Sequence, residues 1–255
     1  MIRATINDNY KELSSFIVSI PSCFSAIETI LYQGRNDIRK IEYNDERLVI
    51  KRFNSSSFLK RFIATFVTSK ARKAYFNALK LNEKGIASPL PIAYIEEKNR
   101  IGLVGKSYLV TTFTDMKPIS DEMNEFDEFN KVLMKDFARF AANLHQSGII
   151  HNDLNSTNVR FQIHEDHYSF SVIDINRMKI YTKQPPSIDC CLEDLTRFCS
   201  FTDMYKYFIL EYLKARGWSV SMYERALYIK QKHDRRYDRR KMFLGGIKRL
   251  WNKFM

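Results

Sequence analysis

Three oxygen-bearing side chains have the types and spacing that metal-dependent phosphoryl transfer requires. Asp153 and Asn158 lie five positions apart in the segment HNDLNSTN, and Asp174 ends the later segment SVID. Mg²⁺ prefers oxygen ligands, usually one or two carboxylates together with substrate phosphates. Asn158 and Asp174 can therefore hold a nucleotide-bound metal while Asp153 faces an acceptor hydroxyl.

The segment between these side chains predicts how they meet. VRFQI and YSFSVI alternate apolar and polar residues around the turn residues HEDH, a pattern typical of a β-hairpin. The second strand of a hairpin ends beside the start of the first. We therefore expect Asn158 and Asp174 to lie side by side.

The first part of the chain is expected to hold a sheet. Three β-prone runs in 27–53 are separated by the turn-forming segments QGRN and YNDE, which predicts an antiparallel meander. Residues 55–85 carry apolar residues at helical spacing, and Gly85 suits the end of that helix. Strands return in 91–113. The prediction is about five strands with one main helix.

The second part is expected to be mainly helical. The segment NKVLMKDFARFAANLHQSG places Leu133, Phe137 and Leu144 on one apolar stripe ended by Gly148, which predicts a helix with a buried face. The best boundary lies near TDMKP, giving parts 1–114 and 115–255. At 255 residues and 45% hydrophobic content, the chain can bury a core in each of two lobes.

Several segments resemble those of kinases. HNDLNSTN resembles the kinase catalytic loop, VIDIN resembles the metal-binding strand end, and LVIKRF resembles the strand that carries the nucleotide lysine, here Lys51. The order of elements over residues 28–215 implies an α+β, bilobal protein-kinase-like fold, with an antiparallel sheet in the amino-terminal lobe and a mostly helical carboxy-terminal lobe.

A narrower resemblance is to the bacterial lipopolysaccharide kinases that phosphorylate Kdo or heptose of the inner core. The segments GRNDIRK, LVIKRF, SKARKAYFNALKLNEKGIASPLPIAY, HQSGIIHNDLNSTNVRF and VIDINRMK carry it. It implies Asp153 as catalytic base or hydroxyl orienter, Asn158 and Asp174 as Mg²⁺ ligands, and Lys51 on the α and β phosphates of ATP.

Further roles follow from the resemblance. It implies that His151 braces the catalytic loop and that Asn155 orients Asp153 or contacts phosphate. It also implies nucleotide contacts at Thr112 and Phe113, which end the last strand before the boundary.

The sequence departs from the kinase pattern at two places. The helix after Lys51 has no glutamate in SKARKAYFNALKL, so the carboxylate that pairs with Lys51 is left open. The glycine-rich loop is reduced to Gly34 in YQGRN. Either Gly34 and Arg35 give short cover to the phosphates, or this segment is a plain hairpin turn.

The positive charge is concentrated at the carboxy-terminal end. Residues 230–255 hold ten Lys or Arg and two Asp, so +8 of the formal +12 lies there. Interspersed aromatic and aliphatic residues are typical of a helix lying on anionic lipid. A solvated, charged end of the helical part is the alternative. No nucleic-acid-binding module accompanies the charge, so nucleic acid is not expected as a partner.

The expected location is the cytoplasm, with the protein bound peripherally to the inner face of the bacterial inner membrane. Four cysteines without metal-ligand spacing indicate reduced thiols. No window approaches about 18 uninterrupted apolar residues, and the amino terminus lacks the apolar core of a signal peptide.

The expected function is ATP- and Mg²⁺-dependent phosphorylation of a sugar hydroxyl in the lipopolysaccharide inner core, with Kdo as the favoured sugar. The acceptor would be a core glycolipid. An atypical protein kinase and a non-enzymatic pseudokinase scaffold are the alternatives. The sequence leaves open the sugar and hydroxyl, full activity and the oligomeric state.

Overall fold

The computed structural model describes residues 1–54, 68–100, 102–124 and 128–254, with side chains up to Phe243 in the last helix. Two compact units divide the chain: Met1–Met116 with Ser171–Met178, and Lys117–Phe170 with Lys179–Met255. The short segment 171–178 thus packs with the first unit, although a division into 1–114 and 115–255 assigns it to the second part.

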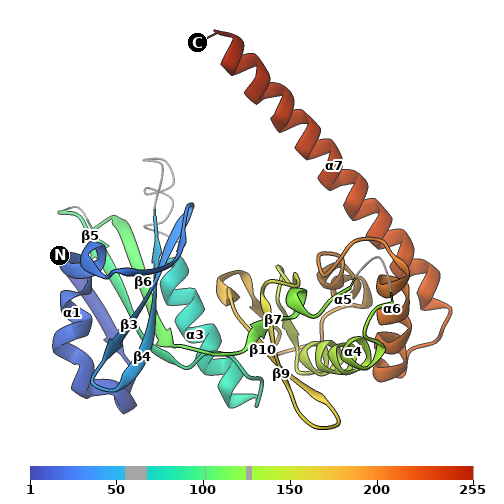
Figure 1. Ribbon diagram of the computed structural model, residues 1–255, viewed down its shortest axis with the longest axis horizontal. Coiled ribbons are helices and arrows are strands. Elements are labelled where there is room, and N and C mark those ends of the chain that lie inside the picture. Colours follow the sequence, from blue (N-terminus) through green and yellow to red (C-terminus); the bar gives the residue numbers. More distant parts are fainter. Residues whose placement is uncertain (55–67, 101, 125–127, 255) are drawn as a thin grey trace. The chain divides into compact units, whose positions relative to one another are not determined.

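The first unit is built on a six-stranded antiparallel sheet in the order β1-β5-β6-β4-β3-β2 (Figure 1). The expected meander is confirmed as β2, β3 and β4. The expected number of about five strands is wrong by one, because β1 joins the sheet edge by pairing with β5. The strands are β1 (Ile2–Ile6), β2 (Thr29–Gln33), β3 (Asn36–Tyr43), β4 (Glu46–Phe53), β5 (Pro91–Lys98) and β6 (Val104–Thr112).

The turn between β3 and β4 fixes the register of the lysine strand. Tyr43 pairs with Glu46, and the two residues between them, Asn44 and Asp45, have φ of 49° and 62°. Asn and Asp tolerate this left-handed region, and a two-residue turn of this kind matches the twist of the strands it joins. The ladder continues without a shift to Lys51, which lies opposite Ile38.

Among the described residues, two helices cover the sheet, so the expectation of one main helix is wrong (Figure 1). Helix α1 (Ser14–Cys23) buries Phe16, Ile17 and Ile20 against strand residues that include Ile50. Leu13, Phe16, Ile17 and Ile20 follow one another at helical spacing, a signal that the sequence already contains. Helix α3 (Lys70–Glu83) lies within the expected helical region, whose part at 55–67 lies outside the described residues.

Strand alternation gives Lys51 its direction. Ile50 is fully buried in the core beneath α1, and successive side chains of a strand point to opposite faces. Lys51 therefore points to the other face. That face carries Tyr94, whose ring lies 5.3 Å from the ring of Tyr75 on α3. Lys51 thus lies on the α3 side of the sheet.

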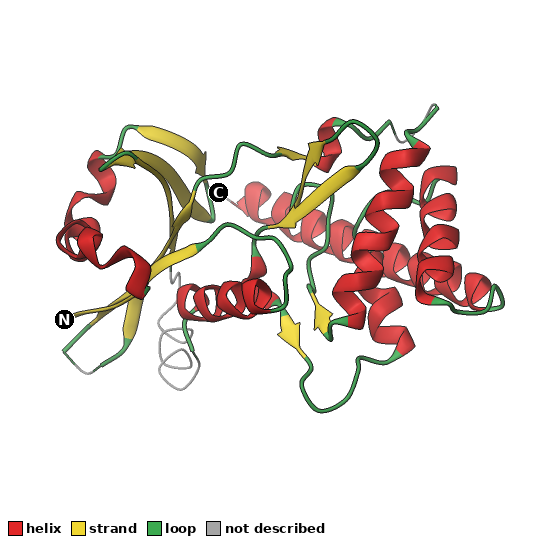
Figure 2. Ribbon diagram, turned by 90° about the horizontal axis from the view of Figure 1, so that it is seen from below, coloured by secondary structure: helices red, strands yellow, loops and turns green. Residues whose placement is uncertain are grey.

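The second unit is mainly helical (Figure 2). A three-stranded sheet has the order β10-β9-β7, and its β9–β10 hairpin closes where His164 donates its backbone N–H to His167. A two-stranded ladder pairs β8 with β11. The elements are β7 (Lys117–Pro118), α4 (Lys131–Gln146), β8 (Ile149–Ile150), β9 (Val159–Ile163), β10 (Tyr168–Val172), β11 (Lys179–Ile180), α5 (Ile188–Leu195), α6 (Asp203–Arg216) and α7 (Met222–Phe254).

A close backbone contact requires glycine between α4 and β8. Gly148 has φ of +76°, and a Cβ atom on it would lie 2.6 Å from the carbonyl oxygen of Tyr181. Tyr181 returns its N–H to the carbonyl of Gly148 at 2.7 Å. Only glycine permits this approach, which ties the strand before the HNDLNSTN loop to the chain after Asp174.

The expected reduced thiols are present: Cys23, Cys190, Cys191 and Cys199 are all free. Burial raises the pKa of Cys191 to about 11, so this thiol stays protonated at neutral pH and is unreactive. No helix among the described residues is long and apolar enough to cross a membrane.

The core of the second unit is an aromatic cluster centred on Phe137 of α4. Its ring stacks on Phe198 and Phe208, with centroids 4.3 and 5.2 Å away, and meets Phe170 at 5.5 Å. Phe137 has no exposed surface. This cluster joins α4, α6 and the hairpin, the elements that carry the HNDLNSTN loop.

Replacing Phe137 by alanine should lower the free energy of unfolding of the second unit by about 3–5 kcal/mol, because a buried aromatic side chain is lost and a cavity remains. Urea unfolding followed by tryptophan fluorescence tests this, since both tryptophans, Trp218 and Trp251, belong to the second unit. Val132→Ala, at a half-exposed position on the same helix, is the matched control and should change stability by less than about 0.5 kcal/mol.

Candidate active site

The candidate residues fall into two groups, one in each unit. In the first unit, Lys51 Nζ lies 2.5 Å from Oδ1 of Asp174, with 14% and 30% of the two side chains exposed. Asn176 donates its amide N–H to the same oxygen at 2.6 Å. Asp174 itself adopts a left-handed conformation with φ of 58°, at the start of the 3₁₀ turn η4 (Ile175–Arg177).

The open question of the partner of Lys51 therefore has an answer: it is Asp174. Helix α3 supplies no glutamate to the lysine, but it holds the turn that carries Asp174. The side-chain amide of Asn77 donates to the carbonyl oxygen of Ile175 at 2.7 Å. The helix thus positions the carboxylate, and the carboxylate positions the lysine.

Lys70, at the first turn of α3, is a site residue that sequence reasoning missed. Desolvation and the positive charges of Arg35, Arg177 and Lys51 lower the pKa of Lys70, and Asp174 opposes them. Lys70 thus experiences like charges from Arg35, Arg177 and Lys51 and an opposite charge from Asp174. Such an excess of positive charge at a helix N-terminus suits a polyphosphate, which would offset the mutual repulsion. The signal in the sequence is SKARK, which follows the lysine strand.

In the second unit, side-chain amides shape the HNDLNSTN loop. The Oδ1 atom of Asn155 accepts hydrogen bonds from the backbone N–H of Thr157 and of Asn158, each at 3.0 Å. Asn158 in turn donates its side-chain N–H to the carbonyl oxygen of Asp153 at 2.9 Å. Asn155 therefore braces the turn, and Asn158 is held against the backbone of Asp153.

The carboxylate of Asp153 has a cationic neighbour that the sequence did not reveal. Arg197, which follows α5, places Nη1 at 3.3 Å from Oδ1 of Asp153. The Asp153 side chain is 18% exposed, and that of Arg197 is 45% exposed. The candidate base is thus partly shielded, and its charge is partly balanced.

A second missed residue, Asp194 of α5, anchors the loop from beneath. Its buried carboxylate accepts the backbone N–H of His151 at 2.8 Å and that of Asn152 at 2.6 Å. His145 lies between it and a tyrosine: Nε2 is 3.2 Å from Asp194, and Nδ1 is 2.7 Å from the hydroxyl of Tyr212. His151, expected to brace the loop, is itself fully buried.

The remaining candidates lie at turns and strand ends of the first unit. Gly34 and Arg35 form the exposed turn between β2 and β3, where Gly34 donates its N–H to Asn36. Thr112 accepts the N–H of Leu90 with its side-chain oxygen at 2.9 Å. Phe113 donates its backbone N–H to Arg47 at 2.8 Å. Their expected contacts with nucleotide stay predictions.

The donor atoms fit a magnesium ion. Asn158 has committed its amide nitrogen to the Asp153 carbonyl, which leaves the amide oxygen as its ligand atom. Asp174 offers a carboxylate. Among the described residues no group of three His, Cys, Asp or Glu could hold a metal by itself. Asp174 belongs to the first unit and Asn158 to the second, and either side chain would hold Mg²⁺ only together with other oxygen donors, such as nucleotide phosphates.

The first unit carries a lysine–aspartate pair with cations beside it, and the second carries the braced Asp153–Asn158 loop. These features are typical of phosphoryl-transfer enzymes of the kinase class. Comparison with known proteins agrees. The sequence matches the lipopolysaccharide kinase (Kdo/WaaP) family over residues 44–212, more than half of the chain. The protein belongs to this family.

The fold is shared with a solved structure. That structure, "WaaP in complex with acyl carrier protein", aligns with a TM-score of 0.63 at 17% identity, covering 91% of this chain and 98% of the WaaP chain. The match confirms the expected α+β, protein-kinase-like fold. Acyl carrier protein is a partner of that WaaP and was not among the partners expected here. No curated protein sequence matches the chain.

Family membership fixes the reaction class. The chain is a phosphotransferase that acts on a sugar hydroxyl of the lipopolysaccharide core, and a kinase of this family uses ATP. The family match includes all the candidate residues from Lys51 to Asp174 and leaves out Gly34 and Arg35.

Lys70→Ala should weaken Mg-ATP binding by about tenfold, because one charge-assisted contact with the phosphates is lost. Titration calorimetry measures this. Lys73→Ala, which removes the same charge from an exposed position one turn further along α3, should change the affinity by less than about twofold. Equal effects of the two variants would show that Lys70 acts only through net charge.

Proposed function

We propose that this protein transfers the γ-phosphoryl group of ATP to a hydroxyl of Kdo in the lipopolysaccharide inner core. The observation that carries the proposal is the family match over residues 44–212, which includes Lys51, Asp153, Asn158 and Asp174. Kdo is the sugar named in the family's description. The Lys51–Asp174 pair and the bracing of the Asp153 loop support a functional rather than a degenerate site.

In this proposal Asp153 receives the acceptor hydroxyl. Its carboxylate accepts the hydroxyl's hydrogen bond and takes the proton as the oxygen attacks the γ phosphorus. Arg197 holds the carboxylate from one side, so that a defined oxygen faces the acceptor. Positioning of this kind supplies much of the rate, since phosphoryl transfer asks for little covalent chemistry from the protein.

On the nucleotide side, Lys51, Lys70, Arg35 and Arg177 neutralise the phosphates of ATP. Asp174 and Asn158 would hold Mg²⁺, which when bound draws charge from the phosphate oxygens. His151 and Asn155 keep the loop in place, through the buried backbone N–H donated to Asp194 and through the turn that Asn155 closes.

Asp153→Ala should lower kcat with a core oligosaccharide acceptor by about 10²–10⁴-fold, since the proton acceptor is lost. Mg-ATP should still stabilise the variant in a thermal-shift titration. Asp174→Ala should instead lose the metal-dependent nucleotide binding. Asp166→Ala, at an exposed position in the hairpin turn, is the control and should behave as the wild type.

The same assay separates the alternatives. Transfer to peptides, with none to delipidated core oligosaccharide, would favour an atypical protein kinase. Absence of stabilisation of the wild type by Mg-ATP would favour a non-enzymatic scaffold. A wild-type rate in Asp153→Ala would contradict the assignment of the base.

We further propose that α7 holds the protein on the cytoplasmic face of the bacterial inner membrane. The helix continues to Phe254, and exposed basic residues share its surface with exposed apolar ones. Each basic residue near an anionic surface contributes about 1 kcal/mol. The basic residues are Arg235, Arg236, Arg239, Arg240 and Lys241, and the apolar ones are Tyr237, Met242 and Phe243.

The double variant Arg239→Ala/Arg240→Ala should bind vesicles with anionic lipid about 30-fold more weakly, since two such contributions are lost. Sedimentation with vesicles measures the effect, and added salt should weaken wild-type binding. Vesicles of zwitterionic lipid are the control. Equal binding of both proteins to anionic vesicles would leave α7 as a solvated helix.

A further inference from the structure

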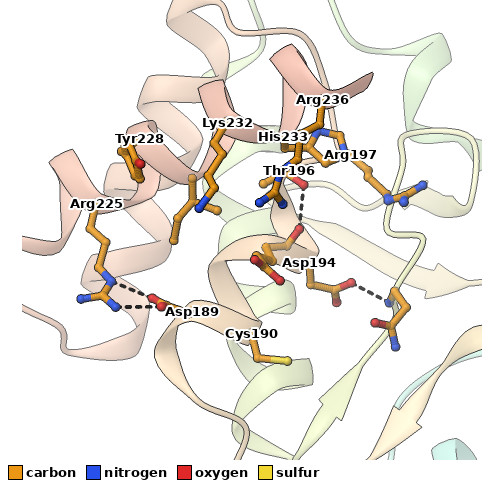
Figure 3. Close-up of a pocket in the computed structure, with 13 residues that line it drawn as sticks. Asp189, Cys190, Asp194, Thr196, Arg197, Arg225, Tyr228, Lys232, His233 and Arg236 are labelled. Atoms are coloured by element: carbon orange, nitrogen blue, oxygen red, sulfur yellow. Dashed lines mark hydrogen bonds and ion pairs between the residues drawn. The ribbon is translucent and has the colours of Figure 1, made fainter. Parts of the chain in front are cut away.

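The second unit contains a cavity of about 540 Å³ that the reaction described above does not use (Figure 3). It is lined by α5, by the residues that follow α5, and by the first half of α7. Four of its lining residues are basic: Arg197, Arg225, Lys232 and Arg236. Arg225, Lys232 and Arg236 recur at helical spacing, so that one face of α7 presents them (Figure 3).

Two of the acidic residues that line the cavity already have hydrogen-bonding partners within the protein. Asp189 binds Arg225 with both carboxylate oxygens, at 2.6 and 2.7 Å. Asp194 is buried and accepts the backbone N–H groups of the catalytic loop. Exposed Glu193 is the third acid of the lining.

Lys232 and Arg236 form no ion pair with any residue in the described part of the chain. Lys232 lies 5.8 Å from the centre of the Tyr228 ring, another lining residue. Asp189 neutralises Arg225, but Lys232 and Arg236 keep their positive charges, so the concave site can attract an anion. Concave walls strengthen such an attraction relative to a flat surface.

The cavity is joined to the candidate base by one side chain. Arg197 lines it and also reaches Asp153, at 3.3 Å. Asn152, the residue before Asp153, lines it as well. A group bound in the cavity therefore lies close to the carboxylate that receives the acceptor hydroxyl, and the two groups can belong to one molecule.

We propose that this cavity binds an anionic group of the acceptor, a sugar carboxylate or a phosphate, through Lys232 and Arg236. The inference rests on the proposed function, since it takes the acceptor to be the anionic core glycolipid. Arg197 then acts as a positioning residue between the bound anion and Asp153. The cavity determines which hydroxyl meets the base, because the anion and the reacting hydroxyl are a fixed distance apart in the acceptor.

Steady-state kinetics with a delipidated core oligosaccharide test the proposal. Lys232→Ala/Arg236→Ala should raise the KM for the oligosaccharide by about 10- to 100-fold, since two charge-assisted contacts are lost. The KM for ATP should not change. Lys131→Ala/Lys135→Ala, which removes two positive charges from exposed positions of α4 outside the cavity, should keep the wild-type KM. Glu193→Gln should lower the KM, because it removes the opposing charge.

Two modified acceptors identify the anionic group. One has its carboxylates reduced to alcohols, and the other has its phosphates removed. The acceptor that lacks the recognised group should give the same KM with the wild type and with the Lys232/Arg236 double variant. If both modified acceptors still distinguish the two proteins, the cavity binds neither group and the proposal is overturned.

A binding measurement separates this inference from the proposed function. Titration calorimetry with the same oligosaccharide should show weaker binding to the double variant, whether or not transfer occurs. Binding by the wild type without transfer would overturn the proposed function and leave the cavity assigned. Transfer with an unchanged KM in the double variant would overturn the inference alone, and so would an effect seen only with lipid-bearing acceptor in vesicles.

Discussion

The ion pair between Lys51 and Asp174 is the constraint on which the first unit depends. It joins residues 123 positions apart in the sequence and ties the short segment 171–178 to a sheet that ends some sixty residues before it. Both charges are partly shielded from water, so each stabilises the other more than an exposed pair would. A lysine without this carboxylate would lose its fixed direction, and the turn η4 would lose its hold on the sheet.

The second unit depends on a different buried charge. Asp194 has no exposed side-chain surface, yet its two oxygens are satisfied by the backbone of the catalytic loop and by His145. A buried carboxylate is tolerated only with such partners, so the loop and α5 require one another. The loop is therefore held by backbone hydrogen bonds from beneath and by the Asn155 turn within itself. Of the candidate side chains of this loop, that of Asp153 is 18% exposed, whereas Asn158 is buried.

Positive charge is concentrated at one place in each of the two units. In the first unit, burial and the positive charges of Arg35, Arg177 and Lys51 lower the pKa of Lys70, and a bound polyphosphate would offset the repulsion among these charges. In the second unit, the basic face of α7 lines a cavity in its first half and carries exposed arginines beyond it. One helix thus presents positive charge to a concave site and to an open surface.

The sequence by itself indicated the candidate site residues and determined the local elements around them. Asp153, Asn158 and Asp174 were proposed from type and spacing, and Lys51 from the resemblance of its strand to that of kinases. The β9–β10 hairpin followed from period-two alternation, and the meander from β-prone runs between turn residues, which are local properties. The apolar spacing of α1 was also present in the sequence and was overlooked.

Only the tertiary structure decided the partner of Lys51, the cluster around Lys70, the anchoring of the loop by Asp194 and the pairing of Arg197 with Asp153. The hydrogen bonds among these contacts join residues 42 to 123 positions apart, where periodicity carries no information. Packing alone selects which charged side chain meets which, because many arrangements of the same local elements satisfy the same sequence pattern.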